Sequence, residues 1–246
     1  MNGSWSRVEI GGKPADVYDL PTSVKPRFGM LHLHGTGLET LTDRPAFTCL
    51  FDELRLVCVC PHGQRSWWAD RVCAEFDPHI TPERYLLQHV VPFFGERWGL
   101  EPRGIGIQGI SMGGQGALRL AFKHPELFPV AAAISSAIEY HERYGQGTPI
   151  DDMYDSKEQC RQDTAIMHIH PSRFPPHIFF CIDPGDVEWY RGNDRLHEKL
   201  SALGVPHEMD LTTRAGGHGW DYFNHMAGRV VRFVHAGLEQ ESRRLL

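Results

Sequence analysis

Short apolar runs alternate with amphipathic segments along most of the chain. The runs have the length of buried strands, and the segments between them carry apolar residues at helical spacing. The expected strands are 5–10, 15–20, 28–34, 55–61, 104–110, 128–136, 177–183 and 206–212, and the expected helices are 44–54, 81–98, 112–124, 193–204 and 221–238. The first two strands flank Gly-Gly-Lys-Pro, which predicts an antiparallel hairpin. Strands that alternate with helices predict an α/β protein with a mainly parallel, doubly wound sheet and helices on both faces.

One segment, 139–176, breaks this alternation because it is mainly polar. We interpret the chain as a single domain, 1–246, from which this segment makes an excursion. Excursions of this kind often cover the crevice where parallel strands end. We therefore expect the segment to lie over a ligand site.

The composition narrows the classes of protein that fit. The 246 residues are 41% hydrophobic and 23% charged, as in ordinary globular domains. A net charge of −6 does not indicate a nucleic-acid surface, and no apolar run is long enough to cross a bilayer. The N-terminal residues lack the features of a signal peptide, so we expect a cytoplasmic protein with neither a nucleic-acid nor a membrane partner. The composition leaves the oligomeric state open.

The six cysteines form no Cys-x-x-Cys pair. Cys58 and Cys60 lie two residues apart in one expected strand, so they share a face of the sheet. We expect buried free thiols, as in a cytosolic protein, with disulfides or a metal site as the alternatives.

The junction between the strand 104–110 and the helix 112–124 carries Gly-Ile-Ser-Met-Gly around Ser111. A sharp strand-to-helix turn exposes such a serine above the sheet, and the flanking glycines let the strand and the helix pass closely. The N–H of Met112 then points into an oxyanion site at the helix N-terminus. We expect Ser111 to be a nucleophile, and a plain turn residue is the alternative.

A second pattern overlaps this junction. Gly104, Gly106 and Gly109 match the Gly-x-Gly-x-x-Gly fingerprint of dinucleotide-binding proteins. The match falls inside the expected strand rather than in the turn after it, so it does not indicate nucleotide binding.

A serine needs a base to remove its proton, and at this kind of junction an acid and then the base follow later in the chain. The chain has 15 histidines, so a lone histidine means little. His218 differs because it lies in Gly-Gly-His-Gly-Trp, between the last expected strand and the last helix. A loop in that place can reach Ser111, so we expect His218 to be the base.

The acid is expected just after the strand 177–183, where Asp183, Asp186 and Glu188 compete. The acid must hold the imidazole in one tautomer and stabilise its charged form. A short side chain in the turn suits this role, which favours Asp186 and leaves the other two open.

A second oxyanion donor is expected in the loop after the strand 28–34. The sequence His34-Gly35-Thr36-Gly37 is similar to the loop that supplies this donor in lipases and esterases. We expect the N–H of Thr36 to be the donor, with Gly37 as the next candidate and a plain turn as the alternative.

Two histidine pairs, His32 with His34 and His168 with His170, have the spacing of same-face strand residues. Such pairs can bind a metal, but no third ligand falls near either of them in the pattern. We therefore expect no metal and no cofactor.

The loop after the strand 55–61 carries Trp67 and Trp68. If this loop lies at the carboxyl end of the sheet, the two indoles could form the wall of an acyl or sugar pocket. Ordinary packing within the loop is the alternative.

Together these motifs resemble the α/β-hydrolase superfamily and, within it, the putative-esterase group of esterase D, feruloyl and acetylxylan esterases and mycolyltransferase-like proteins. Residues 109–118 resemble the esterase D elbow, and residues 216–223 resemble the histidine loop of the family. The resemblance covers about 30–234 and implies an α/β-hydrolase fold and serine esterase activity. The family usually has Gly-x-x-Asp after the strand that corresponds to 177–183. Here Glu188 follows Gly185 at that spacing, so the triad acid stays open.

The expected function is hydrolysis of a small-molecule carboxylic ester through an acyl-enzyme on Ser111. His218 would act as the base, Asp186 would orient it, and the N–H groups of Met112 and Thr36 would bind the oxyanion. An acyltransferase that uses the same acyl-enzyme is one alternative, and a non-catalytic binding protein of the same fold is another. The residues do not define the acyl group or the alcohol.

Overall fold

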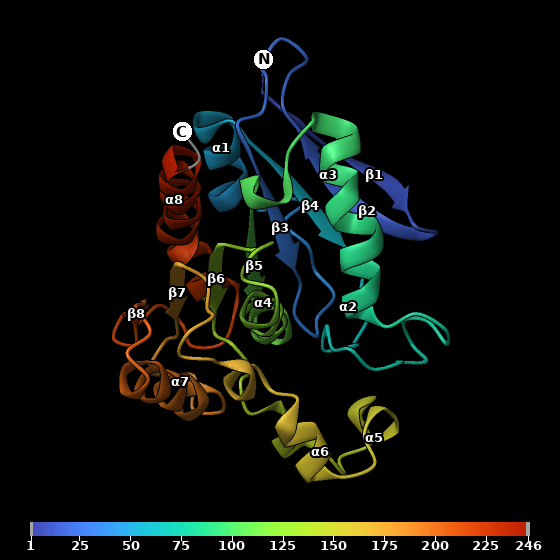
Figure 1. Ribbon diagram of the computed structural model, residues 1–246, viewed down its shortest axis with the longest axis vertical. Coiled ribbons are helices and arrows are strands. Elements are labelled where there is room, and N and C mark those ends of the chain that lie inside the picture. The colour runs from blue at the N-terminus through green and yellow to red at the C-terminus, as the bar shows by residue number, and fades with distance from the viewer. Residues whose placement is uncertain (1, 245–246) are drawn as a thin grey trace.

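A computed structural model describes residues 2–244 and places eight strands in one sheet (Figure 1). The strands are β1 (Ser4–Ile10), β2 (Lys13–Asp19), β3 (Phe28–Leu33), β4 (Leu56–Pro61), β5 (Ile105–Ile110), β6 (Val130–Ile134), β7 (His177–Cys181) and β8 (Glu208–Asp210). Their order across the sheet is β1-β2-β4-β3-β5-β6-β7-β8. β1 and β2 form the hairpin, β2 runs antiparallel to β4, and all the other pairs are parallel. The predicted α/β fold is confirmed.

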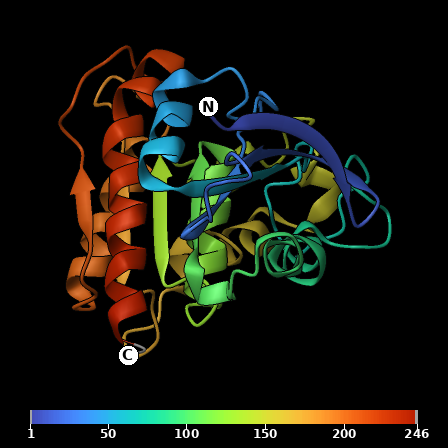
Figure 2. The same ribbon diagram turned by 90° about the horizontal axis from the view of Figure 1, so that it is seen from above.

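Helices cover both faces of the sheet (Figures 1 and 2). They are α1 (Pro45–Leu54), α2 (Pro82–Tyr85), α3 (Val91–Trp98), α4 (Met112–Lys123), α5 (Ile150–Met153), α6 (Lys157–Gln162), α7 (Tyr190–Ala202) and α8 (Trp220–Arg244). Gly29 of β3 lies against Phe94 of α3, and Gly106 of β5 lies against Val234 of α8. Because Gly29 pairs with Ile105, the next residue, Gly106, points to the opposite face. The sheet is therefore enclosed between α3 on one side and α8, with α1 packed on it, on the other.

The central strands are buried along their whole length. Every residue of β3, β4, β5 and β6 is buried, as is usual for parallel strands covered on both faces. Two polar residues inside this core, His32 of β3 and Gln108 of β5, bond to each other, with 2.5 Å between Nδ1 and Oε1. This bond joins β3 to β5, the strand that leads to Ser111.

The helix expected over 81–98 is present, but it is not uniformly α-helical. Thr81 caps it by accepting the Arg84 N–H at 3.2 Å, and a π-helical turn, η1 (Leu86–Val90), separates α2 from α3. Pro92 explains the turn, because proline has no N–H and its ring excludes the carbonyl four residues earlier. The Val91 N–H accordingly bonds to the Leu86 carbonyl, five residues back.

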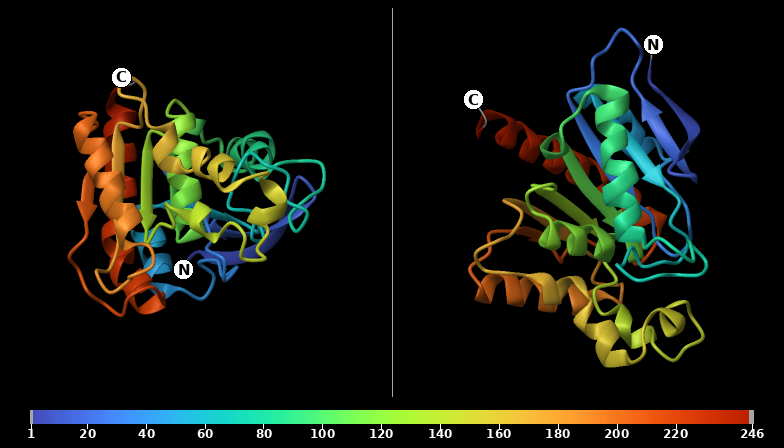
Figure 3. Two further views of the ribbon diagram at one scale, coloured as in Figure 1. Left: turned by 90° about the horizontal axis from the view of Figure 1, so that it is seen from below. Right: turned by 45° about the vertical axis from the view of Figure 1, so that its right-hand side comes forward.

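The polar segment 139–176 contains α5, α6 and two 3-10 turns, η3 (Tyr140–Arg143) and η4 (Ala165–His168). Figure 3 shows it beside α7 at one end of the sheet. Its residues Arg143, Thr148 and Pro149 line a cavity that Ser111 also lines. The segment therefore contributes to the surroundings of the serine.

All six cysteines are free thiols; five are buried and Cys49 is exposed, so the expectation of burial is wrong for Cys49. The sulfur atoms of Cys58 and Cys60 lie 3.8 Å apart on the same strand, β4. In the part of the chain that the structure describes, no helix is both long and apolar enough to cross a membrane.

Candidate active site

Ser111 joins β5 to α4 with φ of 56° and ψ of −117°, a conformation that residues other than glycine rarely adopt. A Cβ on Gly109 would lie 2.0 Å from the Gly113 carbonyl oxygen, and one on Gly113 would lie 1.9 Å from the Leu33 carbonyl oxygen. The strand and the helix therefore pass at a distance that only glycine permits. The Ser111 N–H donates to the Ile134 carbonyl at 2.9 Å, which ties the turn to the next strand.

His218 lies in the loop between β8 and α8, and its ring bridges two side chains. Nε2 is 3.0 Å from Ser111 Oγ, and Nδ1 is 2.5 Å from Asp186 Oδ2. A carboxylate that accepts from Nδ1–H leaves Nε2 free to accept the serine proton. Asp186 is 3% exposed and Ser111 is 7% exposed, so both ends of this line are shielded from water. Three side chains in this arrangement can act as a nucleophile, a base and an orienting acid.

The turn after β7 explains why Asp186 reaches His218. The Asp186 N–H donates to the Asp183 carbonyl at 2.9 Å and closes the turn. The second carboxylate oxygen of Asp186 accepts the Trp189 N–H at 3.2 Å, which fixes the side chain. The structure therefore places the Asp186 carboxylate next to the imidazole.

Asp183 has a different role, which the sequence did not indicate. Its carboxylate accepts the N–H groups of Gly185, Ala215 and Gly217 at 2.6, 2.6 and 2.9 Å. Burial raises the pKa of Asp183, but these three N–H groups outweigh it and hold the pKa below its ordinary value. Two of the three donors belong to the loop that carries His218, so Asp183 anchors that loop.

Glu188 forms an ion pair with Arg143 of the segment 139–176, and its side chain is 47% exposed. It lines the cavity beside Ser111. Although Glu188 stands at the family spacing after Gly185, the structure pairs it with a guanidinium rather than with His218.

Both predicted oxyanion donors lie beside the serine. Met112 is the first residue of α4, and N–H groups in the first turn have no acceptor within the helix. Thr36 lines two cavities together with Ser111. The preceding residue, Gly35, is so near that an added Cβ would lie 3.2 Å from Ser111 Cβ. The arrangement can present two backbone N–H groups to a carbonyl oxygen bound at Ser111.

His34 holds this loop in place. Its Nδ1–H donates to the Gly35 carbonyl at 2.7 Å, and its Nε2 accepts the Gly63 N–H at 3.0 Å. The indole N–H of Trp68 donates to the His34 carbonyl at 3.1 Å, and the two rings pack edge to face. Burial lowers the pKa of His34 to about 4, so the ring is neutral at pH 7 and keeps both bonds.

Two cavities meet at Ser111, and Thr36 and His218 line both of them. The smaller cavity, about 220 Å³, also contacts Glu39, Trp220 and Phe223. The larger cavity, about 290 Å³, also contacts Arg65, Trp67, Arg143 and Trp189. A substrate bound at Ser111 thus has two spaces for its substituents.

A cluster of Glu39, Trp220 and Arg44, of which the first two line the smaller cavity, was not found from the sequence. The Trp220 indole N–H donates to Glu39 at 2.7 Å, and the Arg44 guanidinium lies 3.7 Å from the Trp220 ring. Arg44 also pairs with Glu39 at 2.6 Å. This cluster joins the loop after His218 to the loop after β3, and no motif could indicate contacts between residues so distant in sequence.

The two neighbouring tryptophans differ. Both have positive φ, 56° at Trp67 and 53° at Trp68. Trp67 lines the larger cavity and stacks on Tyr140, with ring centroids 4.7 Å apart and planes 14° apart. Trp68 is fully buried and packs against Gly63 and Gly116. The pocket interpretation thus fits Trp67, and the packing interpretation fits Trp68.

The histidine pairs considered as metal ligands contact protein groups. His32 bonds to Gln108, His168 Nε2 lies 3.2 Å from Asp163, and His170 Nδ1 accepts a backbone N–H at 3.1 Å. Within residues 2–244 no three or more His, Cys, Asp or Glu side chains are grouped to hold a metal ion.

Comparison with known proteins gives a family and a fold. The family model described as "Putative esterase" matches residues 55–228. No curated protein sequence matches the chain significantly. Three similar solved structures cover nearly all of the chain at low sequence identity, which shows a shared fold.

The first is FphF of Staphylococcus aureus, a fluorophosphonate-binding serine hydrolase, with a TM-score of 0.75, 18% identity and coverage of 96% of this chain and 99% of that one. An S-formylglutathione hydrolase from Agrobacterium tumefaciens has a TM-score of 0.78, 17% identity and coverage of 97% and 100%. A ferulic acid esterase has a TM-score of 0.75, 17% identity and coverage of 96% and 98%. These structures have the α/β-hydrolase fold that the described strands and helices form.

Proposed function

The chain belongs to the Putative esterase family of ester hydrolases, and we propose that it cleaves carboxylic esters through Ser111, with His218 as base and Asp186 as the acid that orients it. The observation that carries this proposal is the unbroken hydrogen-bonded line from Asp186 through His218 to Ser111. The line ends on a serine held in strained backbone geometry, where its Oγ faces the base.

Acylation begins when Ser111 Oγ attacks the ester carbonyl and His218 Nε2 takes the serine proton. Negative charge then develops on the carbonyl oxygen, which the N–H groups of Met112 and Thr36 stabilise. The imidazolium of His218, stabilised by Asp186, gives its proton to the oxygen of the departing alcohol. The acyl group remains bonded to Ser111 Oγ.

Deacylation repeats these steps with water. His218 Nε2 removes a proton from a water molecule, whose oxygen attacks the acyl carbonyl. The same two N–H groups stabilise the second oxyanion. His218 then returns a proton to Ser111 Oγ, and the carboxylic acid leaves. Both half-reactions use protein groups and water alone.

The two cavities that meet at Ser111 support the proposal that the substrate is a small-molecule ester. Each cavity would hold one substituent of the ester. We also propose a cytoplasmic location, because the six free thiols suit a reducing compartment.

The test is hydrolysis of p-nitrophenyl acetate by the wild type and by Ser111→Ala. Loss of the nucleophile is expected to lower kcat by at least about 10³-fold. Ser201→Ala, an exposed serine on α7, is the matched control and should keep the wild-type rate. Urea unfolding of both variants checks that they are folded. A Ser111→Ala protein that hydrolyses the ester at the wild-type rate would contradict the proposal.

A further inference from the structure

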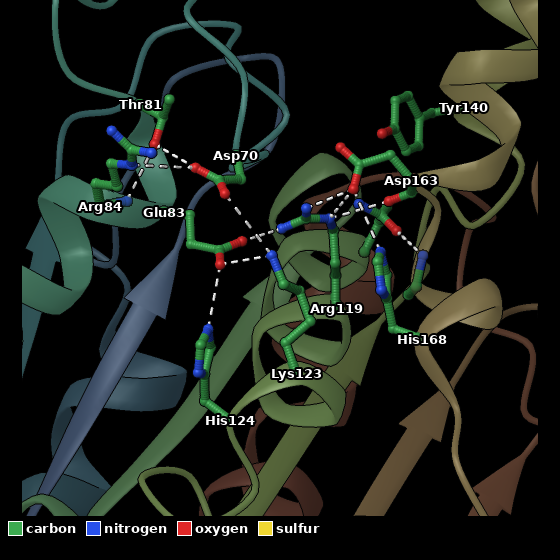
Figure 4. A network of polar contacts seen from close by, with 12 residues as sticks. Asp70, Thr81, Glu83, Arg84, Arg119, Lys123, His124, Tyr140, Asp163 and His168 are labelled. Carbon is green, nitrogen blue, oxygen red and sulfur yellow. Dashed lines mark hydrogen bonds and ion pairs between the residues drawn. The ribbon is translucent and has the colours of Figure 1, made fainter.

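A buried guanidinium lies on the helix that begins at the nucleophile. Arg119 of α4 has a side chain that is 1% exposed, and it pairs with Glu83 of α2 and with Asp163 of the segment 139–176. Lys123 also contacts Glu83, at 2.6 Å. Figure 4 shows Arg119 between the two carboxylates, one on each side. The cluster therefore joins three parts of the chain that are far apart in sequence.

These groups are charged in the folded protein. Burial lowers the pKa of Arg119, but Asp163 and Glu83 raise it above its ordinary value. Burial also raises the pKa of Asp163, but His168 and Arg119 outweigh it and hold the pKa at about 2. Taking charges out of water costs much of what their attraction returns, so such clusters contribute little to net stability. What they do provide is a fixed geometry between the elements that they join.

A continuous line of contacts leads from this cluster to the larger cavity. The Tyr154 hydroxyl donates to Asp163 Oδ2 at 2.7 Å, and it therefore accepts the Tyr140 hydroxyl, 2.8 Å away. Tyr140 in turn stacks on Trp67, which lines the cavity together with Ser111. Tyr154, Tyr140 and Trp67 are buried, and the contact between Tyr154 and Asp163 is partly buried.

A second contact ties the same segment to the same helix. Gln115 Oε1 accepts the Ala165 N–H at 2.6 Å. Ser111, Gln115 and Arg119 are spaced by four residues, so the two attachment residues share the face of α4 that begins at the nucleophile. The helix that positions Ser111 thus also holds the segment that carries Tyr140.

We propose that Arg119, Asp163, Tyr154 and Tyr140 are positioning residues that fix Trp67 relative to Ser111 and thereby determine which ester substituents the larger cavity accepts. The inference rests on the proposed esterase function. It assigns a role in substrate selection to groups that do not touch the substrate. Trp67 is the side chain through which they act.

The decisive variant is Tyr154→Phe, which removes one hydroxyl from the line and keeps the ring. The rates to compare are kcat/KM for two series of esters, p-nitrophenyl esters of increasing acyl length and acetate esters of increasingly bulky phenols. We expect the ratio of kcat/KM for the bulkiest ester to kcat/KM for the smallest ester to shift at least fivefold in one series. The shift should come from KM rather than from kcat. The rate for the smallest ester should stay within twofold of the wild type.

Tyr140→Phe removes the neighbouring hydroxyl and should have the same effect. Because both hydroxyls belong to one line, the double variant should shift the ratio no further than either single variant. Tyr85→Phe is the matched control, since Tyr85 is also buried but its hydroxyl has no hydrogen-bond partner in the described part of the chain.

The inference is overturned if the kcat/KM ratio of Tyr154→Phe stays within twofold of the wild-type ratio in both series. It is also overturned if Tyr85→Phe shifts this ratio equally. Labelling of Ser111 by fluorophosphonates with small and bulky substituents provides a second readout that needs no substrate. A wild-type protein that is neither labelled nor active would contradict the proposed function itself. A labelled and active wild type whose selectivity the Tyr→Phe changes leave intact would contradict only the positioning role.

Discussion

At the scale of single residues, the site depends on backbone that is held against its own preference. A non-glycine residue in the conformation of Ser111 costs on the order of 1–3 kcal/mol. Neighbouring backbone groups hold it there: the Ser111 carbonyl accepts the N–H groups of Gln115 and Ala137, both at 3.1 Å. In this conformation Oγ lies 3.0 Å from His218 Nε2, so the proposed nucleophile and base are already in contact.

The proposed role of Asp186 as the triad acid is tested by two amide substitutions. Asp186→Asn keeps the shape of the side chain but cannot hold the imidazole tautomer or stabilise its charge, so kcat should fall about 10³- to 10⁴-fold. Glu188→Gln removes the partner of Arg143 and should lower kcat less than about tenfold. Steady-state kinetics on p-nitrophenyl acetate measures both. A larger loss in Glu188→Gln than in Asp186→Asn would assign the acid to Glu188.

At the scale of elements, the sequence predicted features that lie within one segment of the chain, but it did not predict contacts between distant segments. Apolar periodicity predicted the helix over 81–98, but Pro92 inserted a π turn that periodicity does not report. The glycines around Ser111 predicted the elbow because their spacing reflects one local crossing. The pairing of Arg119 with Asp163 joins residues 44 apart, and neither residue carries a signal of its partner.

The loop after β3 allows a prediction of how the free energy of unfolding depends on pH, because it contains the buried His34. Burial lowers the pKa of His34 from 6.5 to about 4, so the unfolded chain binds a proton there between these pH values and the folded chain does not. Stability therefore falls as the pH falls through this window, by about 2 kcal/mol at pH 5 from this residue. Urea unfolding from pH 7 to pH 5 should give a shallower pH dependence for His34→Asn than for the wild type.

His79→Asn is the control for this comparison, because His79 is exposed. Its unfolding free energy should follow the wild-type curve across the same pH range. Equal slopes for the wild type and His34→Asn would show that His34 is not buried as a neutral ring in the folded protein.

At the scale of the whole molecule, the topology assembles the site. Thr36 follows β3, Ser111 follows β5, Asp186 follows β7 and His218 follows β8. The carboxyl ends of parallel strands lie at one edge of a sheet, so loops from four strands meet there. This is why a strand pattern and a few local motifs predicted both the fold and the candidate residues.

Some features of the site could not be predicted, for physical reasons. The sequence left three acids open after β7, and the choice among them depends on how the turn closes from Asp183 to Asp186. Trp67 and Trp68 are neighbours of the same type and both are buried, yet only Trp67 lines the larger cavity. The cluster of Glu39, Arg44 and Trp220 forms only when two distant loops are brought together.

Ser111 is proposed to act as a nucleophile that His218 activates, and covalent labelling measures this directly. The wild type is treated with a fluorophosphonate and the modified peptide is identified by mass spectrometry. We expect one adduct, on Ser111, and labelling at least about 10²-fold slower in His218→Ala because the serine proton has lost its acceptor. An unlabelled wild type, an adduct on another residue, or an unchanged rate in His218→Ala would contradict the account.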